Sequence, residues 1–327
     1  MVARRKERLV THSFQIQKRW IGFTCLLLTL LSWSTVPLFQ RHLASHLDFW
    51  TNNGWRYGAS AIFWLPAIFW AIKKQRLSRQ IWVDALLPSL ANILGQIAFT
   101  AAFAKINPGL VTFGLRTQLI WVALGAWFFI PSERPIIASP RYLCGAAILI
   151  GGLLPVLLGG NLSLQGAAFD GVLLSILSAL GYGLYGLSVR KCMHTYHPIT
   201  AFAVICQMTA AGLLALMLVY GRDHGFYVPE LPTQIVWELA LSALLGIAIG
   251  HVLYYTSIAG IGVVITSGVL QLQPFLVSVA SFFFFGEVFQ WWQWAAGFVA
   301  IGGAFLMMTS RGPRAKKLMM ASSEGSD

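Results

Sequence analysis

Long apolar stretches dominate this chain, and they limit it to a small set of folds. A helix that crosses a bilayer needs about 20 consecutive apolar residues, and stretches of this length recur along the sequence between short polar turns. Hydrophobic residues make up 57% of the chain and charged residues 10%, whereas soluble domains carry roughly 25% charged residues. We predict an all-α integral membrane protein with ten transmembrane helices, at 21–39, 54–72, 82–104, 109–130, 143–159, 168–189, 199–219, 236–258, 262–285 and 291–309.

The two halves of the chain share one pattern of glycines and polar residues. When the third and fourth predicted spans are aligned with the eighth and ninth, residues match in one register: Gly95 with Gly250, Gln118 with Gln273, and Glu133 within one residue of Glu287. A glycine-rich helix then closes each half. A match of this kind indicates an ancient duplication. We therefore predict two five-helix repeats, 21–159 and 166–310, between a basic N-terminal segment, 1–20, and a basic, polar tail, 311–327.

The positive charge is distributed as in a membrane protein. Most of the 23 lysine and arginine residues fall at alternate ends of the predicted spans, in the N-terminal segment, in the tail and in every second loop. This bias predicts that both termini are cytoplasmic. Because each repeat has an odd number of spans, the second repeat would be inverted relative to the first. The net charge of +12 is then explained by anchoring to anionic lipids, and we expect no contact with nucleic acid.

Several classes of site are not indicated by the sequence. The four cysteines, Cys25, Cys144, Cys192 and Cys206, show no paired spacing, so neither a disulfide framework nor a metal site is expected. The chain has no P-loop, no nucleophile motif and no dinucleotide fingerprint. We expect no cofactor and no enzymatic activity. An integral-membrane enzyme that acts on lipid is the alternative from another class, and the absence of paired catalytic residues argues against it.

Arg116 is the most informative polar residue, because it lies about eight residues inside the fourth span. Charged groups are costly at that depth and usually face a cavity or a partner. Its planar fork suits a carboxylate or phosphate, so we expect it to bind an anionic group of a substrate. The alternative is a structural pairing with a helix carbonyl, Glu133 or Glu287. Arg56 lies nearer the outer end of its predicted span, where its side chain could snorkel to the surface, so we expect a structural role for it.

His251 is a candidate for proton exchange, since it is the histidine well inside a predicted span. The alternative is a neutral histidine that bonds across helices. In the repeat alignment His251 matches Gln96, so the two residues are expected to face each other across the pseudo-two-fold axis. Asn92, four residues before Gln96, would extend this polar stripe on the third span.

Further bulky polar residues are expected to line the same cavity. They recur at helical spacing or lie beside the central spans, and they are Tyr182, Tyr185, Gln271, Gln273 and Trp33.

Three local patterns resemble one known family. They are the Trp33–Pro37 stretch, Arg56 in a YGAS context, and the QPF…GE segment from Gln273 to Glu287 with GFVAIGG after it. Together with the repeated five-helix unit, they are similar to the EamA family of the drug/metabolite transporter superfamily. The first half departs from the pattern at Leu119, which stands where the second half has Pro274. The resemblance implies a ten-span transporter of the bacterial inner membrane, in a family whose members carry amino acids, drugs, sugars and other metabolites.

These observations together predict a secondary transporter. It would move a small polar or amphipathic metabolite, such as an amino acid or a related compound, by alternating access, with export as the expected direction and protons as a candidate coupling ion. Efflux of cationic or amphipathic drugs is the alternative of the same class. The sequence does not define the substrate or an oligomeric state.

Overall fold

The computed structural model describes residues 2–131, 134–158, 167–261, 266 and 269–310. Within them every regular element is a helix. In the first half these are α1 Val2–Leu43, α2 Phe49–Lys73, α3 Arg79–Asp84, α4 Leu86–Ala102, α5 Pro108–Gly114, α6 Gln118–Phe129, α7 Arg134–Ile137 and α8 Pro140–Leu158. In the second half they are α9 Ala167–Cys192, α10 Pro198–Tyr220, α11 Thr233–Ala243, α12 Gly250–Ile261, α14 Gln273–Phe285 and α15 Trp291–Met308.

Eight of the described segments are long and apolar enough to cross a membrane. They are Arg19–Leu43, Arg79–Ala102, Pro108–Phe129, Pro140–Leu158, Ala168–Cys192, Pro198–Tyr220, Thr233–Ser257 and Trp291–Met308. α2 has 25 residues but is not among them, and α14 is a shorter apolar helix of 13 residues. The multi-pass membrane fold is therefore confirmed. The number of ten spans stays a prediction.

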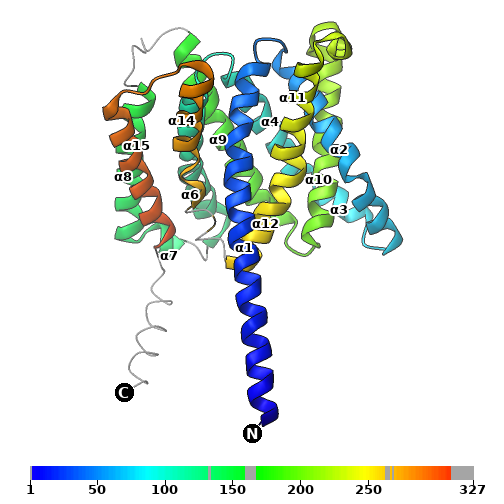
Figure 1. The fold of residues 1–327 in the computed structure, drawn as a ribbon, viewed down its shortest axis with the longest axis vertical. Helices are drawn as coiled ribbons and strands as arrows, with labels where there is room; N and C mark the ends of the chain where they lie inside the picture. Colours follow the sequence, from blue (N-terminus) through cyan, green and yellow to red (C-terminus); the bar gives the residue numbers. More distant parts are fainter. Residues whose placement is uncertain (1, 132–133, 159–166, 262–265, 267–268, 311–327) are drawn as a thin grey trace.

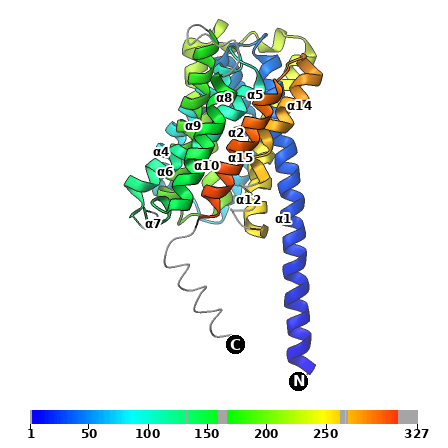
Figure 2. The same cartoon turned by 90° about the vertical axis from the view of Figure 1, so that its left-hand side faces the viewer.

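The helices form one bundle in which α1 begins and α15 ends on the same side (Figure 1). The N-terminal part of α1 extends well beyond the bundle, and the view from the side shows the same projection (Figure 2). The most extensive helix pairs are α8 with α15, α4 with α9, α2 with α10 and α1 with α12, and α5 packs on α14. Every one of these pairs joins a helix of the first half to a helix of the second.

α8 and α15 touch through their backbones. A Cβ built on Gly303 would lie 2.3 Å from the amide nitrogen of Leu149, and one built on Gly152 would lie 2.4 Å from that of Ala300. Only glycine permits helices to approach so closely.

Two of the long helical segments contain a break. Leu115–Thr117 is a 3₁₀ turn between α5 and α6, and Leu244–Ile249 is a π-helical turn between α11 and α12. Such turns leave backbone carbonyls without their usual helical partners and often mark functional sites. At the π turn the carbonyl of Leu245 accepts a hydrogen bond from Ser32 Oγ at 2.9 Å, and that of Ala243 accepts one from Ser60 Oγ at 3.3 Å.

The structure corrects the expected position of Arg56. α2 begins at Phe49 rather than near residue 54, so Arg56 lies two turns inside the helix, and it is 1% exposed. Its Nε donates to Ser242 Oγ at 3.0 Å, and Gln40 lies within hydrogen-bonding distance. Arg56 therefore does not snorkel to the surface, because the polar residues before it are helical and buried rather than part of a loop. A structural role for Arg56 stays a prediction.

Candidate functional site

Arg116 lies in the 3₁₀ turn between α5 and α6 and reaches across to the start of α14. Its Nη2 donates to Gln273 Oε1 at 3.1 Å, and its Nη1 donates to the carbonyl of Leu270 at 3.2 Å and to Gln271 Oε1 at 3.5 Å. Its Nε donates to the carbonyl of Thr112 at 3.1 Å. Three of the predicted site residues are thus in direct contact.

The partners of Arg116 in the described part of the chain are all neutral. Of the two acids considered as partners, Glu287 pairs with Arg41 instead, and Glu133 lies outside the described residues. Neutral amide and carbonyl oxygens solvate the guanidinium but leave its positive charge in place. The group therefore retains the charge that an anionic ligand would require.

Gln273 connects Arg116 to the first helix. Its Nε2 donates to the backbone carbonyl of Trp33 at 2.8 Å. The Trp33 ring packs at 5.5 Å from the His251 ring and at 5.1 Å from the Tyr254 ring, measured between centroids. α1, α12 and α14 therefore meet the fourth span at one place.

His251 is held between aromatic rings. It stacks on Phe202 with a centroid distance of 4.7 Å and an interplanar angle of 23°, and Nδ1 lies 3.1 Å from the carbonyl of Ile247. Phe202 also contacts Tyr255 edge-on, and Tyr255 lies beside Tyr185. The contacts described for His251 do not include Gln96, so the expectation that these two face each other stays a prediction.

Asn92 belongs to a second polar group, on α4. Its Nδ2 donates to the hydroxyl of Tyr57 at 3.1 Å and to that of Thr209 at 3.3 Å. Gln96, one turn later, is 8% exposed, and its Oε1 has no hydrogen-bond donor among the described residues. An unsatisfied buried amide oxygen is uncommon in native proteins.

Tyr182 and Trp33 occupy corresponding places in the two halves. A Cβ built on Gly95 of α4 would lie 3.0 Å from the Tyr182 ring, and one built on Gly250 of α12 would lie 2.4 Å from the Trp33 ring nitrogen. Gly95 and Gly250 are the glycines that the repeat alignment matches. The glycine of each half thus packs against an aromatic side chain of the other half. Sequence spacing alone did not reveal this correspondence.

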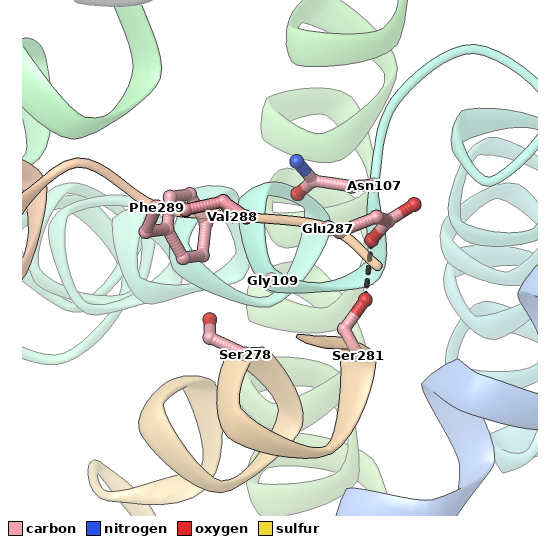
Figure 3. Close-up of a pocket in the computed structure, with 7 residues that line it drawn as sticks. All are labelled: Asn107, Gly109, Ser278, Ser281, Glu287, Val288 and Phe289. Carbon is pink, nitrogen blue, oxygen red and sulfur yellow. Dashed lines mark hydrogen bonds between the residues drawn. The ribbon is translucent and has the colours of Figure 1, made fainter. Parts of the chain in front are cut away.

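The end of the bundle opposite to the chain termini is bridged by an ion pair and a hydrogen bond from the end of α1. Arg41 Nε lies 3.4 Å from Glu287 Oε1, and His42 Nδ1 lies 2.5 Å from Glu238 Oε2. Glu287 follows α14 and also accepts a hydrogen bond from Ser281 (Figure 3). Burial raises the pKa of Glu287, while Ser281 and Arg41 act in the opposite direction. The sequence pattern offered Glu287 as a partner of Arg116, whereas the structure pairs it with Arg41.

No metal centre is formed by the residues that the structure describes, since no group of three or more His, Cys, Asp or Glu side chains is close enough to hold an ion. The histidine at position 42 is engaged with Glu238 instead. All four cysteines are free.

Comparison with known proteins supports the fold and the family. The chain is similar to a solved structure titled "Crystal structure of protein", with 18% sequence identity and a TM-score of 0.59, over 89% of this chain and 96% of that one. This likeness concerns the fold alone. Curated proteins give no match. The EamA-like transporter family matches twice, at residues 20–158 and 170–309, one match for each half. The chain is therefore a member of the EamA-like transporter family.

Proposed function

We propose that this protein is a secondary transporter with ten transmembrane helices in two inverted five-helix repeats. It exports a small polar or amphipathic metabolite, such as an amino acid, across the bacterial inner membrane, with both termini in the cytoplasm. Two observations support the repeat. First, the main helix pairs correspond between the halves. The third span packs on the sixth through α4 and α9, and the eighth span packs on the first through α12 and α1. In addition, Gln118 and Gln273 each begin a helix at the matched position.

The observation that carries the proposal is the environment of Arg116. A permanent positive charge lies in a helix break and is held by Gln271, Gln273 and backbone carbonyls, without a carboxylate among its described partners. An unpaired charge in a membrane-spanning segment is costly and is usually functional. A substrate carboxylate would complete the site by accepting both arms of the fork. Trp33 and His251 would wall the adjoining space, and Asn92, Gln96, Tyr182 and Tyr185 would supply polar contacts from the other half.

Alternating access requires that one end of the bundle be closed while the other is open. The pairs Arg41–Glu287 and His42–Glu238 join α1 to the end of α14 and to α11 on the side away from the termini. We interpret this arrangement as the outward-closed conformation. In this interpretation α1 releases these partners when the site opens to the periplasm.

A ligand screen on the purified protein tests the substrate class. Zwitterionic and anionic compounds that bind the site should stabilise the protein by about 2.7 kcal/mol at a hundredfold excess over their dissociation constants. Their matched amides, which lack the carboxylate, should give a much smaller shift in melting temperature. If amides and cationic dyes stabilised the protein as well as carboxylates did, the anion-binding role of Arg116 would be rejected.

Efflux of cationic amphipathic compounds is the second candidate, and one observation favours it. Trp33, Tyr254, Tyr255 and Phe202 form a continuous aromatic wall, and such faces attract organic cations. Arg116 opposes this reading through charge repulsion. The same screen separates the two candidates, because cationic dyes would be the stabilising class.

His251 is proposed as a proton carrier in coupled transport, since imidazole exchanges protons in the physiological range. His251→Gln keeps a hydrogen-bonding side chain of similar size and copies the residue at the matched position Gln96. We expect this variant to exchange substrate passively but to lose accumulation driven by a pH gradient in proteoliposomes. Full dependence on the gradient in His251→Gln would leave the histidine as a packing residue against Phe202.

A further inference from the structure

A small pocket lies at the bridged end of the bundle, apart from the Arg116 cluster. It is formed where α5 begins and α14 ends, and it is lined by Asn107, Gly109, Ser278, Ser281, Glu287, Val288 and Phe289. Figure 3 shows the hydroxyls of Ser278 and Ser281 projecting from α14 toward the start of α5 and the segment that carries Glu287. The polar atoms on its walls are hydroxyl, amide and carboxylate groups, which are ligands for hard cations.

The unpaired hydroxyl of Ser278 is the first observation that points to a ligand in this pocket. The residue is 2% exposed, and its hydroxyl has no hydrogen-bond partner among the described residues. A buried hydroxyl without a partner is uncommon in native proteins. Gly109 lets α5 pack closely against this hydroxyl, because a Cβ at this position would lie 2.4 Å from Ser278 Oγ and 2.5 Å from the Phe289 ring.

Glu287 supplies negative charge to the pocket. Its side chain is 17% exposed and has Arg41 as its ionic partner. Arg41 is also bound elsewhere, since its Nη1 donates to the carbonyl of Phe103 at 2.9 Å. Neighbouring polar groups already have partners, Glu238 with His42 and Lys105 with Asp170. α5 contributes the neutral Asn107 at its start.

The end of α14 adds a favourable potential for a cation. α14 ends at Phe285, and Gly286 closes it in the left-handed conformation with a φ of 66°. The C-terminal end of a helix carries a partial negative charge. Ser281, on the last turns of α14, and Glu287, just after it, therefore lie where this partial charge and the carboxylate act together.

We propose that the Glu287 pocket binds a monovalent cation, either a proton or sodium, which competes with Arg41 for the carboxylate. A hydronium ion would transfer its proton to Glu287 and leave as water, while sodium would bind the carboxylate and hydroxyl oxygens without a change in covalent bonds. Either event removes the attraction that holds Arg41, so the end of α1 separates from α14. Burial raises the pKa of Glu287, which favours proton uptake at a higher pH than for an exposed carboxyl.

Cation binding can be measured without transport. The interpretation of the helix separation as opening of the outer end rests on the proposed function. The experiment therefore uses the purified full-length protein without substrate. Spin labels at Ser45→Cys beyond α1 and Phe284→Cys on α14, in a background free of native cysteines, report the separation of the two helices. Sodium chloride is varied against choline chloride at constant ionic strength of about 100 mM, so that screening stays the same, and pH is varied in a second series without sodium.

If the ligand is sodium, adding it near pH 8 should lengthen the label distance and shift the melting temperature. If the ligand is a proton, sodium should have no effect, and lowering the pH should lengthen the distance and produce the infrared band of a protonated carboxyl. Glu287→Gln should abolish the change in label distance, whether sodium or pH causes it. In the case of a proton, the infrared band of the protonated carboxyl should also be absent. Glu238→Gln, which alters the other outer ion pair, should retain whichever response is seen.

Two further variants keep the test decisive if Glu287→Gln does not fold. Gly109→Ala places a methyl group against Ser278 Oγ and Phe289, so it should displace Ser278 and weaken a sodium response severalfold. Ser281→Ala removes a hydrogen bond that lowers the pKa of Glu287, so it should move the midpoint of a pH response to higher pH. The proposal is overturned if neither sodium nor pH changes the label distance. It is also overturned if the response survives in Glu287→Gln, or if both Gly109→Ala and Ser281→Ala leave the response unaltered. Loss of ligand binding at Arg116 with an intact cation response would reject the transport site alone.

Discussion

Gly303→Leu should separate α15 from α8 and destabilise the protein by about 3 kcal/mol or more. Even the first atom of the new side chain would lie 2.3 Å from the backbone nitrogen of Leu149 and 2.6 Å from the carbonyl oxygen of Gly145. Backbone atoms within a helix cannot move aside as a flexible side chain does, so the whole helix must shift. Overpacking at a closely packed contact typically costs about 1–3 kcal/mol, and backbone clashes lie at the upper end or beyond.

Gly302→Leu is the matched control, because no atom lies within 4 Å of a Cβ built at this neighbouring glycine. Both variants make the same chemical change on adjacent residues of one helix. Melting temperature and monodispersity in detergent should therefore change strongly for Gly303→Leu and little for Gly302→Leu. Equal stability of the two variants would show that α8 and α15 do not approach through glycine as the structure describes.

Arg116→Lys should lower the transport efficiency for a carboxylate substrate by roughly 10- to 100-fold while the protein still folds. Lysine keeps the positive charge but lacks the planar fork that contacts Gln273, Leu270 and Thr112 at once. The loss of one charged hydrogen bond, worth about 1.5–3 kcal/mol, corresponds to a change of this size. Initial rates of uptake into proteoliposomes over a range of substrate concentrations measure it.

Arg79→Lys is the control for this variant, since Arg79 is exposed at the start of α3. It should transport as the wild type does. If Arg116→Lys left transport unchanged, or if it prevented folding, the contacts to Gln271 and Gln273 would be explained as a structural connection between the fourth and ninth spans.

Hydropathy predicted the membrane class because the bilayer imposes both the length and the composition of a span. It misplaced the start of α2 for a physical reason. Thr51, Asn52 and Asn53 resemble a polar loop, yet each is fully buried in the helix. Asn53 accepts a hydrogen bond from Thr100 at 2.9 Å and donates to the carbonyl of Gln96 at 3.3 Å. Partners more than 40 residues away make these side chains compatible with a helix, and a local pattern does not contain them.

The helix break in the first half was also difficult to predict from sequence, because Leu119 replaces the proline of the second half. The structure nevertheless has a 3₁₀ turn at Leu115–Thr117. Thr112 donates to the carbonyls of Pro108 and Gly109, and Thr117 donates to that of Gly114. Threonine hydroxyls that bond to the preceding turn bend helices, so threonines accompany a distortion here that the second half associates with Pro274.

For the candidate site, the residue types could be predicted and the groupings could not. A charged or bulky polar residue inside an apolar span is visible in the sequence, and this identified Arg116, Gln273 and His251. Their contacts run through Trp33, which lies 240 positions from Gln273 in the chain. The aromatic stacking of His251 on Phe202 likewise depends on how α10 packs beside α12, which helical spacing does not specify.

The π turn at Leu244–Ile249 gives the eighth span an adjustable register. A wide turn holds one more residue than an α-helical turn, so the helix after it is rotated by about 100° relative to an uninterrupted α-helix. If the wide turn moved along the chain by one residue, the residues it passed would swing around the axis while both ends of the span stayed in place. Ser32 and Ser60, which bond the carbonyls of Leu245 and Ala243, oppose this migration. Migration of the turn beyond position 251 would carry His251 from the Trp33 side toward another neighbour, while the rest of α12 stayed in place.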